Sequence, residues 1–118
     1  MKLLCAIDSS QESKFVVDEV AGHPWPSGTT ACVLHLIDWP RPASDASVLP
    51  AFQQLAAPIV KEAFDEIRRA GLQTSAEVLE GHPRIAAAEY AKERGVDLVL
   101  VCSHGPSELV RFLVGRLL

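Results

Sequence analysis

The sequence has no excess of positive charge, and this argues against a protein that binds nucleic acids. Lys and Arg number 11 against 15 Asp and Glu, and the formal net charge is −4. Domains that bind nucleic acids need a basic patch that neutralises phosphates, and no such cluster occurs in this chain. We therefore predict that neither DNA nor RNA is a partner.

Cysteines are few, and each lies inside a separate apolar run. They are Cys5, Cys32 and Cys102. None belongs to a Cys-x-x-Cys pair, so the spacing predicts neither a structural zinc site nor a disulfide framework. The histidines His23, His35 and His82 are equally dispersed, so no metal site is expected. Reduced thiols of this kind are typical of cytoplasmic proteins.

Long apolar runs are also missing. At the start of the chain, only the short run LLCAI separates Lys2 from Asp8, which is too short for the core of a signal peptide or for a membrane span. Hydrophobic residues make up 48% of the sequence and charged residues 22%, within the range of folded soluble domains. We predict a single cytoplasmic domain over residues 1–118 with no membrane partner.

Apolar runs alternate with helical patterns along the chain. The expected strands cover residues 2–8, 30–38, 72–80 and 96–102. Helices are expected between them: one after a capping box formed by Ser9 and Glu12, one over residues 55–70, and one from Pro83 to Gly95. After the Ser-His-Gly-Pro turn at residues 103–106, a further helix is expected to run to Gly115.

This alternation predicts an α/β fold in which helices cover both faces of a parallel sheet. In such sheets, ligands bind beyond the carboxyl ends of the strands, where the strand order reverses. Asp8 ends the first expected strand, and the turn from Cys102 to Gly105 ends the fourth. If these two strands are neighbours, both features border one crevice.

Four segments together resemble the universal stress protein family. They are the strand-end Asp8, LHLID at 34–38, GHPRIAAAEYAKERGVDLVLV at 81–101, and the SHG…LVG segment at 103–115. The resemblance covers nearly the whole chain. It implies a flavodoxin-like or Rossmann-like three-layer α/β sandwich that is usually a homodimer, and one branch of the family binds ATP.

In that branch, the resemblance implies a phosphate loop of Gly, two residues, Gly, nine residues, Gly, and Ser or Thr. The corresponding positions here are Cys102, Gly105, Gly115 and Arg116. The spacing is kept, but Cys102 adds a side chain where backbone N–H groups should approach a phosphate. Arg116 replaces a short hydroxyl contact with a longer charge-assisted one. We expect altered anion binding.

The resemblance also assigns roles to residues at the strand ends. Asp8 would contact the ribose or adenine of ATP or AMP, Leu36 would offer backbone groups to the base, and Ala6 and Val101 would line the pocket. For Asp8 the alternative role is to cap the following helix. For Leu36 and Val101 the alternative is a place in the hydrophobic core.

The family's final strand commonly forms the dimer edge, and the sequence stops at Leu118 before such a strand. We expect a C-terminally short domain that lacks the family's fifth strand. The apolar strand over 96–102 would then be an exposed edge, which natural proteins avoid. Either the chain is shortened or a partner covers that edge.

Two rival chemistries involve the turn. Ser103 and His104 suggest a hydrolase triad with Asp8, but adjacent residues of a strand point to opposite faces and are poorly placed to share a proton. We assign both to turn and polar pocket roles and expect at most slow nucleotide hydrolysis. Cys102, next to a helix start, could be a redox-sensitive thiolate or simply a small buried side chain.

Two functions remain open at this point. The first is a stress-response binding module that senses ATP or AMP through the altered phosphate loop. The second is a nucleotide-free protein that acts in stress adaptation by dimerising. The loop identities at 102 and 116 favour the second, whereas the retained spacing and Asp8 favour the first.

Overall fold

Four parallel strands and three helices alternate along the chain, as expected. The computed structural model describes residues 1–8, 13–37, 49–81, 83–102 and 109–113. The parallel strands are β1 (Lys2–Ile7), β2 (Thr30–Ile37), β3 (Gln73–Glu80) and β4 (Leu98–Cys102), and the helices are α1 (Ser13–Gly22), α2 (Leu49–Arg69) and α3 (Pro83–Arg94). The sheet order is β3-β2-β1-β4-β5, in which β5 (Leu109–Leu113) is the last strand, and this order confirms the Rossmann-like α/β class.

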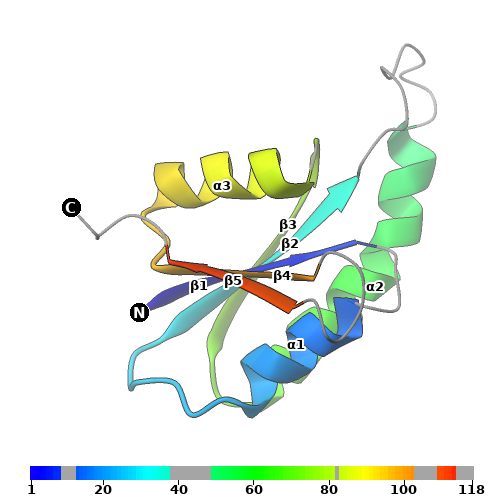
Figure 1. The fold of residues 1–118 in the computed structure, drawn as a ribbon. Coiled ribbons are helices and arrows are strands. Elements are labelled where there is room, and N and C mark those ends of the chain that lie inside the picture. Colours follow the sequence, from blue (N-terminus) through cyan, green and yellow to red (C-terminus); the bar gives the residue numbers. More distant parts are fainter. Residues whose placement is uncertain (9–12, 38–48, 82, 103–108, 114–118) are drawn as a thin grey trace.

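The helices cover opposite faces of the sheet, with α1 and α2 on one side and α3 on the other (Figure 1). Successive residues of β1 point to alternate faces: Leu3 and Cys5 pack with α1 and α2, whereas Leu4 and Ala6 pack with α3. Burial on both faces explains why the strands read as almost continuous apolar runs. None of the described helices is long and apolar enough to cross a membrane.

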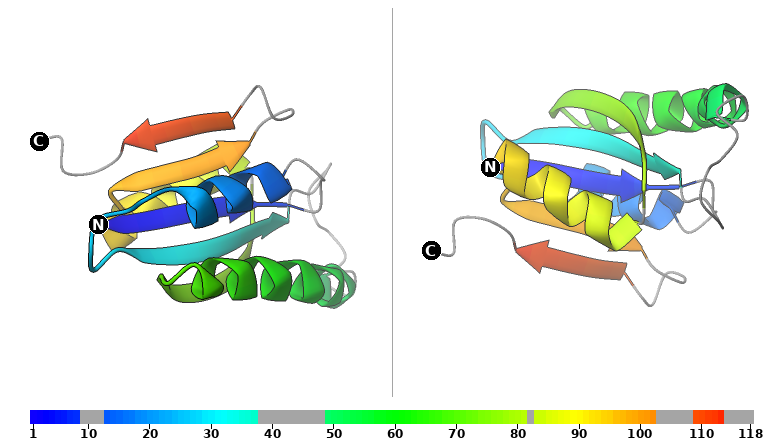
Figure 2. Two further views of the ribbon diagram at one scale, coloured as in Figure 1. Left: turned by 90° about the horizontal axis from the view of Figure 1, so that it is seen from below. Right: turned by 90° about the horizontal axis from the view of Figure 1, so that it is seen from above.

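The last described element corrects the sequence prediction. Residues Leu109–Leu113 form β5, a strand antiparallel to β4, where we expected a helix (Figure 2). Short apolar runs are ambiguous between helix and strand, and the open edge of β4 offers backbone groups that a strand can pair and a helix cannot. β5 therefore covers the edge of β4, for which the sequence had suggested either a shortened chain or a covering partner. The described sheet thus has a fifth strand, but this strand is antiparallel to β4.

The turn after α3 depends on a glycine in the left-handed conformation. Gly95 has φ 65°, the N–H of Val96 donates to the carbonyl of Ala91, and the N–H of Gly95 donates to that of Lys92. This pair of bonds is the Schellman arrangement, which satisfies carbonyls that the helix end leaves unpaired. It turns the chain from α3 into β4, so it also sets the start of that strand. Pro83 begins α3, as predicted.

We predict that Gly95→Ala lowers the free energy of unfolding by about 1–2 kcal/mol, because a Cβ is strained at this φ. The added Cβ would meet open space, so the cost is conformational rather than steric. Gly22→Ala is the matched control: its Cβ also meets open space and its φ is not positive. Urea unfolding of both variants measures the difference. Equal effects of the two substitutions would contradict this account of the turn.

Candidate functional site

The carboxyl ends of β1 and β4 meet at one edge of the sheet. The two strands pair in parallel with Ala6 opposite Val101, so Asp8 and the end of β4 at Cys102 lie at the same edge. β2 flanks β1 on its other side, with Ile7 opposite His35. The chain therefore leaves β1 towards β2 on one side and returns to β4 on the other, which is the arrangement expected of a ligand-binding switch point.

Asp8 is tied to the start of α1. The hydroxyl of Ser13 donates to Oδ1 of Asp8 at 2.9 Å, and the backbone N–H of Asp8 donates to Oγ of Ser13 at 2.8 Å. Ser13 is the first residue of α1 and is buried, and a carboxylate is favourable at a helix N-terminus. These contacts agree with the helix-capping alternative. The capping box of Ser9 and Glu12 lies outside the described residues.

The apolar members of the predicted site are core residues. Ala6, Leu36 and Val101 are all buried in the cluster that packs against α3. Their side chains hold the strand ends together beneath the edge, so the core alternative for Leu36 and Val101 is confirmed. A contact of their backbone groups with a ligand stays a prediction.

The phosphate loop is described only where it begins. The backbone of Cys102 pairs with Leu109, and Ser103, His104, Gly105, Gly115 and Arg116 lie outside the described residues. β5, the strand that leads towards Gly115, ends at Leu113 opposite Leu98, which is the first residue of β4. The described strand thus runs away from the edge that carries Asp8.

His35 is a feature of this region that the sequence interpretation missed. It is only 2% exposed, and neither ring nitrogen has a hydrogen-bond partner. Burial lowers the pKa of His35, although the nearby charge of Asp8 acts in the opposite direction. The alternation of side chains along β2 places His35 on the same buried face as Val33. This alternation can be read from the sequence, and it could have predicted that His35 is buried.

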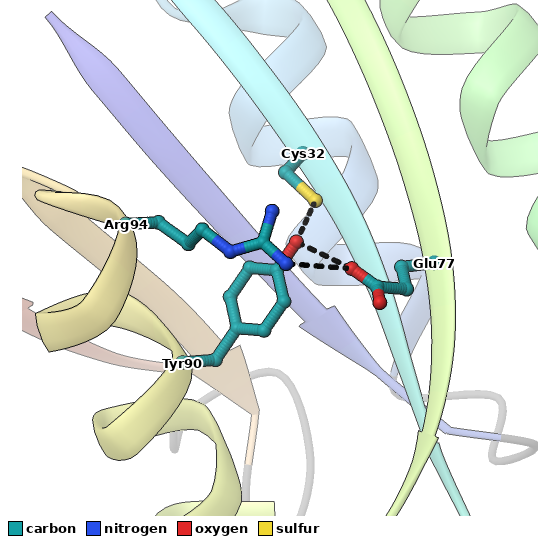
Figure 3. A network of polar contacts seen from close by, with 4 residues as sticks. All are labelled: Cys32, Glu77, Tyr90 and Arg94. Carbon is teal, nitrogen blue, oxygen red and sulfur yellow. Dashed lines mark hydrogen bonds and ion pairs between the residues drawn. The ribbon is translucent and has the colours of Figure 1, made fainter.

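A polar network between the sheet and α3 was not predicted either. The hydroxyl of Tyr90 on α3 donates to Oε2 of Glu77 on β3 at 2.7 Å and lies 3.5 Å from Sγ of Cys32 on β2 (Figure 3). Burial, followed by these two contacts, raises the pKa of Tyr90 above its usual range. Among the described residues, no group of three His, Cys, Asp or Glu side chains is placed to hold a metal ion.

The strand order and the helix layers define the class of the protein, which is a doubly wound α/β domain. Within this class, the chain belongs to the universal stress protein family, whose family model matches residues 1–118. The resemblance seen in the sequence is confirmed.

Solved structures share the fold. A protein of this family from Burkholderia pseudomallei is 20% identical with a TM-score of 0.69, over 83% of this chain and 77% of that chain. UspA from Lactobacillus plantarum is 20% identical with a TM-score of 0.68, over 89% and 78%. A universal stress protein in complex with cAMP is 21% identical with a TM-score of 0.61, over 84% and 73%. No curated protein sequence matches significantly.

We predict that His35→Leu raises the free energy of unfolding by about 1–3 kcal/mol near neutral pH, because leucine removes two buried groups without hydrogen-bond partners. The folded state disfavours the protonated ring, so the unfolded chain binds the proton more readily below about pH 6.5. The wild-type protein should therefore lose stability as the pH falls through this range, and the variant should lose less.

Urea unfolding at several pH values measures both effects, and His23→Leu is the control because His23 is exposed. A loss of stability in His35→Leu at neutral pH, or a pH dependence equal to that of the wild type, would show that the ring has partners in solution.

Proposed function

We propose that this chain is a stress-response binding module that takes an adenine nucleotide at the carboxyl ends of β1 and β4 and recognises its nucleoside part more strongly than its phosphates. The main observation in support of the proposal is the pairing of β1 with β4. This pairing brings Asp8 and Cys102, the last residue of β4, to the same edge of the sheet. A solved relative with the same fold is described in complex with cAMP, which supports a nucleotide as the ligand class.

Asp8 is the group best suited to the nucleoside. A carboxylate accepts hydrogen bonds from the hydroxyls of a ribose, and such charge-assisted bonds are stronger than neutral ones. Its link to Ser13 holds it at the start of α1, so that it is positioned before a ligand arrives. Preorganisation of this kind reduces the entropy lost on binding.

The phosphate side of the site is weaker. Cys102 and Arg116 stand where the ATP-binding branch has a glycine and a hydroxyl, and β5 leads away from the strand-end edge before Gly115 is reached. Few backbone N–H groups are then expected to converge on a phosphate chain. We infer that the second and third phosphates of ATP add little affinity.

We predict that AMP and ATP bind with affinities that agree within about threefold, and that Asp8→Ala weakens both by about tenfold or more, since hydrogen bonds to charged groups contribute about 1.5–3 kcal/mol. Calorimetric titration measures these affinities, with GMP as the non-adenine comparison.

Ser13→Ala is the matched control, because it breaks the same link to α1 but keeps the carboxylate. If Ser13→Ala loses as much affinity as Asp8→Ala, the carboxylate acts through the helix rather than on the ligand. If wild-type protein binds none of the nucleotides, the proposal is wrong.

A second candidate function is a nucleotide-free dimerising module, and the position of β5 favours it. β5 is the last strand of the described sheet and pairs with β4 on one side only. An edge strand of this kind is a template for pairing with another chain. Sedimentation equilibrium should then give a dimer without nucleotide, and a monomer at every accessible concentration would remove this candidate.

A further inference from the structure

A separate hollow lies at the opposite end of the sheet from Asp8. It has a volume of about 390 Å³ and is bordered by the first residues of three strands, Lys2, Thr30 and Gln73, together with Arg94 at the end of α3. Cavities that hold small ligands start at about 300 Å³, so the space suits a molecule of about one ring with its substituents.

Three hydrogen bonds, two of which involve a side chain, hold the rim of this hollow in place. The N–H of Lys2 donates to Oδ2 of Asp97 at 2.8 Å, and the N–H of Asp97 donates back to the carbonyl of Lys2 at 2.9 Å. Nζ of Lys2 donates to the carbonyl of Arg94 at 3.0 Å. The start of β1 is thus fastened to the turn between α3 and β4, and the ammonium group of Lys2 is kept at the rim.

Arg94 is also held in place by its neighbours, and its side chain stays partly exposed to solvent. Its guanidinium lies 4.6 Å from the centre of the Tyr90 ring, and Nη2 is 3.7 Å from Oε2 of Glu77, which is too long for a hydrogen bond (Figure 3). Tyr90 already donates to that oxygen at 2.7 Å. The Arg94 side chain is 56% exposed, so a ligand can reach the guanidinium.

The lining therefore combines positive charge with a partly apolar floor. Lys2 and Arg94 line the hollow, and the carboxylates of Asp97 and Glu77, which are not part of the lining, lie beside these two residues. Cys32, Tyr90 and Val96, which lie on the face of the sheet that α3 covers, supply apolar surface beside them. A guanidinium and an ammonium on one rim match a carboxylate or a phosphate.

We propose that this hollow binds a small organic anion, with a carboxylate or phosphate group between Lys2 and Arg94 and an apolar body against the floor. The ligand is distinct from the nucleotide of the proposed function, because the site lies at the amino ends of the strands and shares no residue with the edge around Asp8. The inference stands whether or not a nucleotide binds at the edge around Asp8.

Titration of the protein with benzoate and with inorganic phosphate, followed through backbone amide NMR signals, tests the proposal. Benzoate carries both the anionic group and the apolar body, whereas phosphate carries the anionic group alone. We expect benzoate to shift the signals of Lys2, Thr30 and Arg94 with saturation at about 10 mM or below. Saturable shifts with phosphate at the same residues would identify a phosphate rather than a carboxylate as the preferred group.

Two variants and a control sharpen the test. Arg94→Gln should weaken binding of the probe about tenfold, and Ser75→Leu should abolish it by filling the hollow. Lys92→Gln removes one positive charge from the same helix outside the lining and should leave the affinity unchanged. The proposal fails if neither probe saturates, if the shifts lie at Asp8 instead, or if Lys92→Gln weakens binding as much as Arg94→Gln does.

Discussion

The backbone pairing of β1 with β4 is the constraint on which the rest of the structure depends. β1 lies between β2 and β4, and its residues Leu4 and Cys5 are fully buried on opposite faces. Because the chain crosses to one side of β1 through α1 and returns on the other through α3, two helix layers are required and the strand ends open at one switch point. A change in this pairing would move Asp8 away from the end of β4.

The two ends of the sheet differ in chemistry. At the carboxyl ends, burial lowers the pKa of His35, and the nearby carboxylate of Asp8 acts in the opposite direction. At the amino ends, Lys2 and Arg94 border a hollow, and the carboxylates of Asp97 and Glu77 lie beside these two residues. The same sheet thus has a carboxylate near a buried histidine at one end and two cationic side chains at the rim of a hollow at the other.

Sequence periodicity correctly predicted the strands and helix ends that depend on local sequence patterns. The runs at 2–8 and 96–102 are so continuously apolar that only buried strands satisfy them, and Pro83 and Gly95 mark the ends of α3 correctly. The strand at 109–113 could not be predicted, because its conformation depends on the open edge of β4 rather than on its own residues. The Cys32–Tyr90 contact joins residues that are 58 positions apart in the sequence, and no local sequence pattern predicts a contact over such a separation.

The most direct measurement of the central claim is the position of bound AMP, read from backbone amide signals during a titration. The account predicts that the largest changes fall on Ile7, Asp8 and Cys102, at the meeting of β1 and β4. Signals of Lys2, Thr30 and Gln73 at the opposite end should stay in place. Saturable changes confined to that opposite end, with Asp8 unaffected, would contradict the account.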